Sequence, residues 1–285
     1  MSGTLYCAKT VRELLDSHGF KFSKSMGQNF LVDANIPEKI VRLSGVDRTC
    51  GVLEVGPGLG ALTSVLSRTA GCVTAVELDG RLMPILRDLF VNLSNVEIVQ
   101  GDILKLDIAK LVCEKMPGMN YHVCANLPYN ITTPALASFI STGVFEAITV
   151  MIQKEVATRI CASPGSKDYG AFTIFVNYHS EPDILFDVPP ECFIPRPGVY
   201  SSVVTMKKRA ERMLEPEREA VFFRVVRASF GQRRKTLVNA LHAVYASSLS
   251  KASIEGMVRE CGFDVRVRGE MLGIEEFMRL SALFC

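Results

Sequence analysis

The chain has 285 residues, of which 48% are hydrophobic and 22% are charged, and its formal net charge is only +2. These values are typical of a soluble protein with room for one large and one small domain, and this charge alone does not indicate a nucleic-acid binder. No uncharged apolar run reaches 18 residues and no signal-peptide pattern opens the chain, so we expect no membrane association. Nine cysteines without Cys-x-x-Cys spacing and four isolated histidines predict reduced thiols in the cytoplasm and no metal site.

Seven apolar stretches predict strands that alternate with helices. The stretches are 51–56, 73–78, 96–100, 121–126, 146–153, 183–188 and 201–207. We expect the first five strands to be parallel and the last two to form a closing hairpin. Helices alone are predicted beyond residue 208, near 211–230, 236–246, 253–261 and 274–283.

The predicted fold is therefore α/β, a Rossmann-like sheet of seven strands followed by a small helical domain. We expect three parts: an N-terminal arm at 1–30, the sheet domain at 31–208 and the helical domain at 209–285.

A glycine-rich turn follows the first strand, in the sequence Gly-Val-Leu-Glu-Val-Gly-Pro-Gly-Leu-Gly at 51–60. Glycines at 56, 58 and 60 allow the backbone to turn tightly and to approach a ligand closely. The next strand ends at Glu77, 21 positions after Gly56. An acid at that spacing is placed to accept hydrogen bonds from the ribose hydroxyls of a nucleoside cofactor.

The class of cofactor follows from the spacing of the glycines. The pattern is Gly-x-Gly-x-Gly and not the dinucleotide Gly-x-Gly-x-x-Gly, and no Arg or Lys near the turn is placed to meet a pyrophosphate. A nucleoside without phosphate fits better, which indicates S-adenosylmethionine, with a nicotinamide dinucleotide as the alternative. Asp102, after the third strand, is placed to accept from the adenine amine, or alternatively to cap the next helix.

Residues 126–129, Asn-Leu-Pro-Tyr, follow the apolar run at 121–125 and should lie at the carboxyl end of a strand, where open α/β sheets bind ligands. The Asn126 amide oxygen and a backbone carbonyl next to Pro128 can accept hydrogen bonds from an exocyclic amine of a nucleobase. Tyr129 offers a flat face for an extruded base, so we expect Tyr129→Phe to retain most activity. The alternative is a simple strand-to-helix turn with a half-buried tyrosine.

Six short blocks in order link the chain to a known family. They are 26–31 (Met-Gly-Gln-Asn-Phe-Leu), 53–63 (Leu-Glu-Val-Gly-Pro-Gly-Leu-Gly-Ala-Leu-Thr), 125–130 (Ala-Asn-Leu-Pro-Tyr-Asn), 153–157 (Gln-Lys-Glu-Val-Ala), 193–197 (Phe-Ile-Pro-Arg-Pro) and 228–237 (Ala-Ser-Phe-Gly-Gln-Arg-Arg-Lys-Thr-Leu). With these blocks the chain resembles the rRNA adenine N6,N6-dimethyltransferases of the small ribosomal subunit (the KsgA type).

The resemblance implies a class I methyltransferase fold. It further implies S-adenosylmethionine-dependent dimethylation of two adjacent adenosines near the 3' end of small-subunit rRNA, coupled to small-subunit biogenesis. The expected partner is this rRNA within a pre-ribosomal particle, and the enzyme is expected to be a monomer in the cytoplasm.

The resemblance also implies roles for individual residues. Cofactor contacts are expected at Asn29, Leu31, Gly56, Gly58, Glu77, Asp102 and Asn126. The catalytic segment is expected to consist of Asn126, Leu127, Pro128 and Tyr129, with Phe193 completing a sandwich around the target base. Arg233, Arg234 and Lys235, which we expect in a helical segment, suit RNA phosphates, although such a run can also be a solvated face.

One departure from the family pattern follows the 193–197 block, where the usual Lys-Val-Asp-Ser is replaced by Gly198-Val199-Tyr200-Ser201. An RNA contact at 198 or 200 is therefore not carried over from the family. Three other functions stay open. They are dimethylation of large-subunit rRNA that confers antibiotic resistance, adenine methylation of DNA, and a non-catalytic assembly or transcription factor of the same fold.

Overall fold

The computed structural model describes Val11, Glu13, residues 28–232 and residues 234–284. Most of the expected N-terminal arm and the predicted RNA contact Arg233 lie outside these residues. The chain divides into two compact units, Met1–Ala157 with Pro182–Lys208, and Thr158–Glu181 with Arg209–Cys285. This division differs from a single boundary after residue 208, because Thr158–Glu181 groups with the C-terminal helices.

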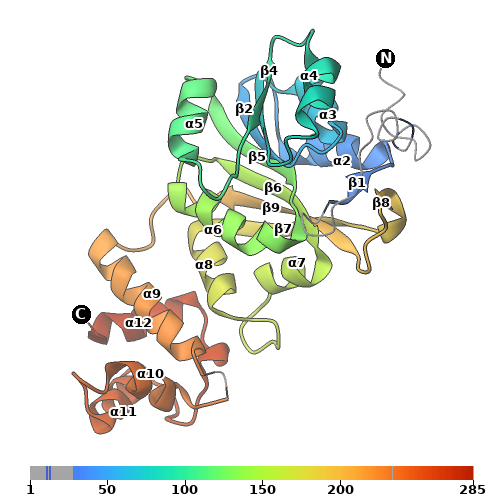
Figure 1. The fold of residues 1–285 in the computed structure, drawn as a ribbon. Helices are drawn as coiled ribbons and strands as arrows, with labels where there is room; N and C mark the ends of the chain where they lie inside the picture. Colours follow the sequence, from blue (N-terminus) through green and yellow to red (C-terminus); the bar gives the residue numbers. More distant parts are fainter. Residues whose placement is uncertain (1–10, 12, 14–27, 233, 285) are drawn as a thin grey trace. The chain divides into compact units, whose positions relative to one another are not determined.

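The first unit is built on a seven-stranded sheet in the order β4-β3-β2-β5-β6-β9-β7 (Figure 1). The strands are β2 (Cys50–Val55), β3 (Cys72–Glu77), β4 (Val96–Gln100), β5 (Asn120–Asn126), β6 (Ala147–Gln153), β7 (Ser180–Val188) and β9 (Ser201–Lys208). The strands β2 to β6 are parallel, and β9 is antiparallel to β6. The predicted seven-stranded α/β fold is confirmed.

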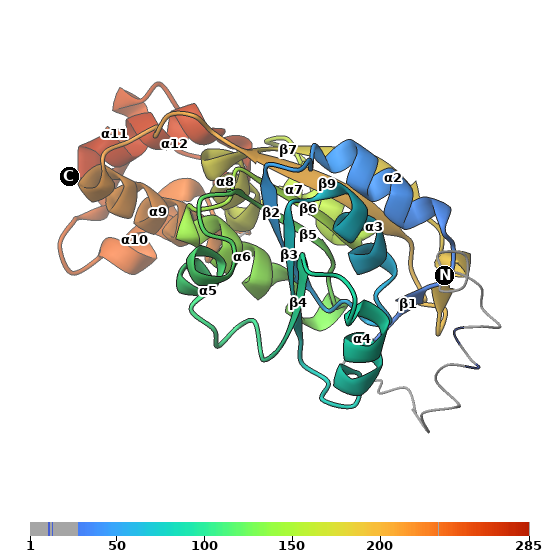
Figure 2. The ribbon, with the colours of Figure 1, turned by 90° about the horizontal axis from the view of Figure 1, so that it is seen from above.

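Helices cover both faces of this sheet, with α2 and α3 on one face and α5 and α6 on the other (Figure 2). Their bounds are α2 (Asn35–Ser44), α3 (Ala61–Thr69), α4 (Met83–Phe90), α5 (Ile108–Lys115) and α6 (Thr132–Thr142), and α7 (Lys154–Ile160) follows β6. Because both faces are covered, every residue of β2 is buried and the strand is apolar at almost every position.

A second, two-stranded sheet was not predicted from the sequence. It pairs β1 (Phe30–Leu31) with β8 (Phe193–Ile194) in antiparallel register, with Phe30 opposite Ile194 and Leu31 opposite Phe193. Two-residue strands carry no periodic signal, so their pairing depends on the tertiary fold. The pairing joins Phe30 and Leu31 of the 26–31 block to Phe193 and Ile194 of the 193–197 block.

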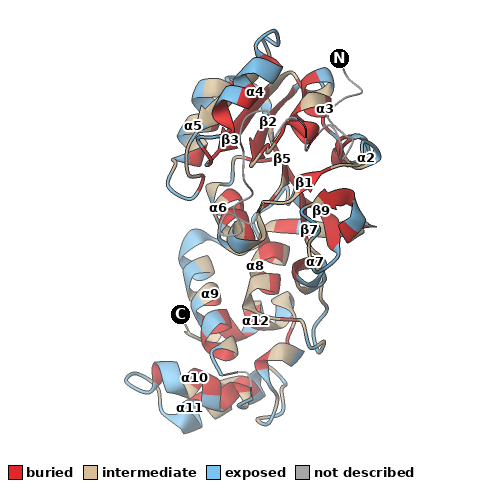
Figure 3. Ribbon diagram, turned by 45° about the vertical axis from the view of Figure 1, so that its right-hand side comes forward, coloured by how far each residue is buried: buried red, intermediate tan, exposed pale blue. Residues whose placement is uncertain are grey.

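The second unit is helical. It contains α8 (Ala171–His179), α9 (Pro216–Phe230), α10 (Leu237–Tyr245), α11 (Lys251–Glu260) and α12 (Ile274–Ser281). The helices α8, α9 and α12 each carry buried residues (red in Figure 3), which belong to one apolar core. In this core the centroids of the Tyr178 and Phe222 rings lie 5.0 Å apart. This aromatic contact explains why α8 belongs to this unit. The four predicted C-terminal helices are present, and α9 begins at Pro216, whose fixed φ suits the first turn of a helix.

No helix in the described part of the chain has the length and apolar character needed to cross a bilayer. Among the described residues, no group of three or more His, Cys, Asp or Glu side chains is arranged to hold a metal ion.

Candidate active site

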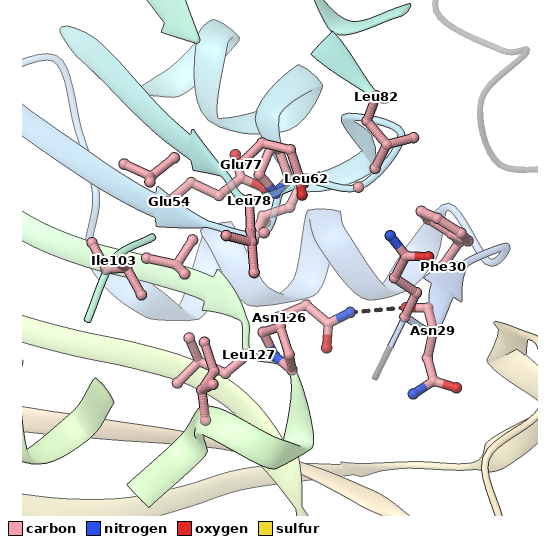
Figure 4. A pocket seen from close by; sticks show the side chains of 18 of the residues that line it. Asn29, Phe30, Glu54, Leu62, Glu77, Leu78, Leu82, Ile103, Asn126 and Leu127 are labelled. Atoms are coloured by element: carbon pink, nitrogen blue, oxygen red, sulfur yellow. Dashed lines mark hydrogen bonds between the residues drawn. The ribbon is translucent and has the colours of Figure 1, made fainter. Parts of the chain in front are cut away.

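A pocket lies at the carboxyl ends of β2, β3, β4 and β5 and is lined by residues from five sequence segments (Figure 4). Its wall includes every residue predicted to contact the cofactor, namely Asn29, Leu31, Gly56, Gly58, Glu77, Asp102 and Asn126. Leu127, Pro128 and Tyr129 line the same pocket. The two predicted motifs, distant in sequence, therefore share one cavity.

The turn after β2 requires glycine at position 58 for two independent reasons. Its φ angle is +60°, a left-handed conformation that other residues rarely adopt. A Cβ there would lie 2.9 Å from Cδ1 of Phe30, whose ring packs on the turn. Gly58 thus allows Phe30 to close one side of the pocket.

Glu77 ends β3 and is only 5% exposed. Its Oε1 accepts a hydrogen bond from the backbone N–H of Asp79 at 2.8 Å, which orients the carboxylate, and burial raises the pKa of Glu77. Asp79 is fixed in turn, since it accepts from Arg81 Nη2 at 2.6 Å and from Gln28 Nε2 at 2.9 Å. The hydrogen bond from Arg81 is the main reason that the pKa of Asp79 is lowered.

Two acids were not singled out from the sequence: Glu54, which lines the pocket, and Asp79, which is hydrogen-bonded to Glu77. Glu54 lines the pocket, is 1% exposed and accepts a hydrogen bond from Thr63 Oγ1 at 2.7 Å. Burial raises its pKa to about 8. The available signal was an acid inside the otherwise apolar strand 52–55, a position that is unfavourable without a specific partner.

Asp102 follows β4 and also lines the pocket. Its Oδ1 accepts from the backbone N–H of Leu104 at 3.1 Å, and its Oδ2 lies 3.3 Å from Lys105 Nζ. The alternative, that Asp102 caps the next helix, is wrong, because Asp107 is the residue that caps α5 by accepting from Lys110 N at 3.0 Å.

Asn126, the last residue of β5, is oriented by a distant backbone group. Its Nδ2 donates to the carbonyl oxygen of Asn29 at 3.2 Å, shown dashed in Figure 4. This contact fixes which way the amide faces and leaves Oδ1 as an acceptor for a ligand, because the hydrogen-bonding partner of the amide defines which end is nitrogen.

The backbone after Asn126 offers one further acceptor. The carbonyl of Pro128 already accepts from Ile131 N at 3.2 Å and from Thr132 Oγ1 at 3.1 Å. Leu127 donates its N–H to Met151 O at 3.1 Å. Of the two carbonyls beside the proline ring, the Leu127 carbonyl is therefore the one that remains for an incoming amine.

Tyr129 is half-buried, and its hydroxyl oxygen lies 2.9 Å from Ser201 Oγ. Burial raises the pKa of Tyr129, so the phenol is neutral near pH 7. Phe193, its expected partner in a base sandwich, is 3% exposed, packs in the core with Leu31 and Val203, and does not line the pocket. A sandwich that includes Phe193 therefore requires a rearrangement that exposes this ring.

The charge of the pocket indicates the kind of ligand. The described residues that line it include the acids Glu54, Glu77 and Asp102 but no Lys, Arg or His. A ligand with positive charge and a ribose would meet the carboxyl groups of Glu77 and Asp102, whereas a phosphate would meet no cationic side chain among the described lining residues. These residues fit S-adenosylmethionine, which carries a sulfonium and an ammonium group, better than they fit a dinucleotide.

The predicted RNA contacts lie in the second unit. Arg234 and Lys235 are exposed, in a turn between α9 and α10, so the prediction that this run lies in a helix is wrong. Gly231 ends α9 and Thr236 caps α10, accepting from Asn239 N, which excludes one continuous helix. Within the described part of the chain, neither cation forms an ion pair, whereas Arg266 is paired with Asp264 at 3.0 Å.

Comparison with known proteins agrees with this site. The family model for ribosomal RNA adenine dimethylases matches residues 19–278. A ribosomal RNA small subunit methyltransferase A from Clostridioides difficile is 45% identical over 95% of this chain and 93% of its own length. The same-named protein from Alkaliphilus oremlandii is 46% identical, over 94% of each chain.

Solved structures show the same fold. A dimethyladenosine transferase from Plasmodium falciparum superposes with a TM-score of 0.73 at 24% identity, covering 88% of this chain and 95% of the other. The 23S rRNA methyltransferase ErmE gives 0.70 at 24% identity, over 90% of this chain and 99% of its own. The match to the family model over most of the sequence leads to one conclusion: the chain belongs to the ribosomal RNA adenine dimethylase family.

Proposed function

We propose that the protein methylates N6 of adenosine in small-subunit rRNA, converting two adjacent adenosines near the 3' end to N6,N6-dimethyladenosine. The observation that carries this proposal is the orientation of Asn126, whose amide nitrogen is held by Asn29 so that its oxygen can accept from an amine beside an acid-lined pocket. The small subunit is favoured over the large one because relatives named for the small subunit are 45–46% identical, against 24% for ErmE.

Different residues of the chain would hold different parts of the cofactor. When bound, S-adenosylmethionine supplies a methyl group on a sulfonium, which is a good leaving group. Glu77 would accept from the ribose hydroxyls and Asp102 from the adenine amine, while the turn at Gly56 and Gly58 allows close approach of the backbone. Asn29 and Leu31 would cover the methionine end.

The target adenine would be held from two sides. Oδ1 of Asn126 and the carbonyl of Leu127 would accept both hydrogens of N6, which directs the nitrogen lone pair toward the methyl group. These acceptors gain strength as positive charge develops on N6, so they favour the transition state over the ground state. The Tyr129 ring would stack on the extruded base, and the amine proton would pass to solvent after transfer.

The remaining interactions are with the ribosome. Arg234 and Lys235, together with Arg233, would contact rRNA phosphates of a pre-ribosomal particle. Their exposure and their freedom from ion pairs among the described residues favour this role for Arg234 and Lys235. We further propose that the protein acts as a monomer in the cytoplasm.

The experiment is methylation of isolated subunits with radiolabelled S-adenosylmethionine. Small subunits that lack the modification, and large subunits as the parallel substrate, are incubated with the protein, and the labelled nucleotides are mapped. We expect two labelled adjacent adenosines, each with two methyl groups, in small-subunit rRNA only. Label in the large subunit would support the resistance-type alternative, and no label in either subunit would support a non-catalytic assembly factor.

A further inference from the structure

Ser201 is a buried polar residue with a partner in the active site. It is the first residue of β9, has no exposed surface, and lies opposite Gln153 of β6. Its Oγ is 2.9 Å from the hydroxyl oxygen of Tyr129, which lies 72 positions earlier in the chain. The two hydroxyls form a neutral hydrogen-bonded pair, because burial raises the pKa of Tyr129.

The location of the Ser201 hydroxyl is set by the sheet. The carbonyl of Tyr200 accepts from Lys154 N at 2.9 Å, and pairing with β6 continues along β9. Tyr129, in contrast, opens the short 3-10 turn Tyr129–Ile131 between β5 and α6 and belongs to no strand. A ring in such a turn keeps one fixed orientation when its far end is hydrogen-bonded to a rigid element.

We infer that Ser201 is a positioning residue for methyl transfer, which holds the Tyr129 ring in the orientation needed to stack on the target base. The inference rests on the proposed function and adds to it a residue that touches neither cofactor nor substrate. It also changes the expectation that Tyr129→Phe retains most activity. Because the Tyr129 hydroxyl anchors the ring, we expect Tyr129→Phe to lower the methylation rate.

Ser202 provides a matched control. It is as buried as Ser201 and lies next to it on the same strand, so its side chain points to the opposite face of the sheet. Its Oγ donates to Asp187 Oδ1 at 2.7 Å, away from Tyr129. Ser202→Ala removes an equally buried hydroxyl and hydrogen bond from β9 and leaves the Tyr129 contact unchanged.

The test is a double-mutant cycle on the single-turnover methylation rate of small subunits. We expect Ser201→Ala and Tyr129→Phe each to lower the rate roughly 3- to 10-fold, the equivalent of one neutral hydrogen bond, and the double variant to be no slower than either single variant. Ser201→Cys should recover part of the rate. Cofactor affinity should be unchanged in all of them, and Ser202→Ala should retain the wild-type rate.

The outcomes separate the inference from the proposed function. If wild-type protein methylates the subunits and Ser201→Ala matches its rate, or if the two substitutions are additive, the inference is overturned and the proposed function stands. If the wild-type protein methylates neither subunit, both are overturned. Thermal unfolding identifies a variant that does not fold, and in that case Ser201→Cys with Tyr129→Phe completes the cycle.

Discussion

The two ends of the active-site pocket are assembled in different ways. At the cofactor end, the hydrogen bonds that orient Glu77 and Glu54 come from residues no more than 19 positions away in the chain. At the target end, Asn126 is oriented by a residue 97 positions away and Tyr129 by one 72 positions away. Local contacts form with the motif itself, whereas distant ones require the complete sheet and the β1–β8 pairing.

The two ends should therefore contribute to two different free energies, that of cofactor binding and that of the transition state for methyl transfer. The cofactor end holds a ligand in its ground state, so its residues should determine cofactor affinity. The target end holds acceptors whose interaction with N6 strengthens as charge develops, so its residues should determine the rate. Two longer contacts also tie the N-terminal segment to the cofactor end, the hydrogen bond from Gln28 to Asp79 across 51 positions and the packing of Phe30 on the turn at Gly58.

The largest effect is expected from Asn126→Ala. Loss of an acceptor that acts mainly in the transition state should lower the single-turnover rate by roughly 10²- to 10³-fold while binding of small subunits barely changes. The measurement is the rate at saturating subunit and cofactor, with binding followed by sedimentation. Near-normal dimethylation would refute the proposed role of this amide.

Glu77→Ala should change the cofactor end of the pocket and lower the affinity for S-adenosylmethionine. Removal of the charge-assisted hydrogen bonds to the ribose should weaken cofactor binding by about 1–3 kcal/mol. Isothermal titration calorimetry with the wild-type protein and the exposed-site control Glu155→Gln provides the comparison. Unchanged affinity would show that Glu77 does not hold the ribose.

Glu54→Gln should change how stability depends on pH. The pKa of Glu54 is about 8 in the folded protein, against an ordinary value of 4.5, so its contribution to stability is full below pH 4.5 and is lost as pH rises toward 8. The free energy of unfolding of the wild type should therefore fall by up to about 1.4 kcal/mol per pH unit relative to the variant in this window. Parallel curves would contradict a protonated Glu54.

The smallest effect is expected in the second unit. Arg234→Ala with Lys235→Ala should weaken subunit binding and reduce the slope of log affinity against log salt by roughly 1.4 to 1.8, with unchanged cofactor affinity. Arg266→Ala is the matched control, because Arg266 is exposed but paired with Asp264. An unchanged slope in the double variant would indicate a solvated face.

Features that depend on local contacts could be predicted from the sequence, whereas features that depend on distant contacts could not. The strands, the glycine turn, Glu77, Asp102 and the 126–129 segment were predicted, because each is a local pattern of spacing and periodicity. The β1–β8 sheet, the Gln28–Asp79 hydrogen bond and the Ser201 contact were missed, because no local pattern marks two residues that meet from 50 or more positions apart. The buried Phe193 shows that a shared motif does not fix side-chain exposure, and the turn that carries Arg234 shows that it does not fix secondary structure.

One paired measurement tests the division of the pocket most directly: single-turnover methylation of small subunits by Glu77→Ala and Asn126→Ala over a range of S-adenosylmethionine concentrations. We predict that saturating cofactor restores most of the rate of Glu77→Ala and restores none of the rate lost in Asn126→Ala. A rate of Asn126→Ala that recovers with cofactor, or one of Glu77→Ala that does not, would contradict the account.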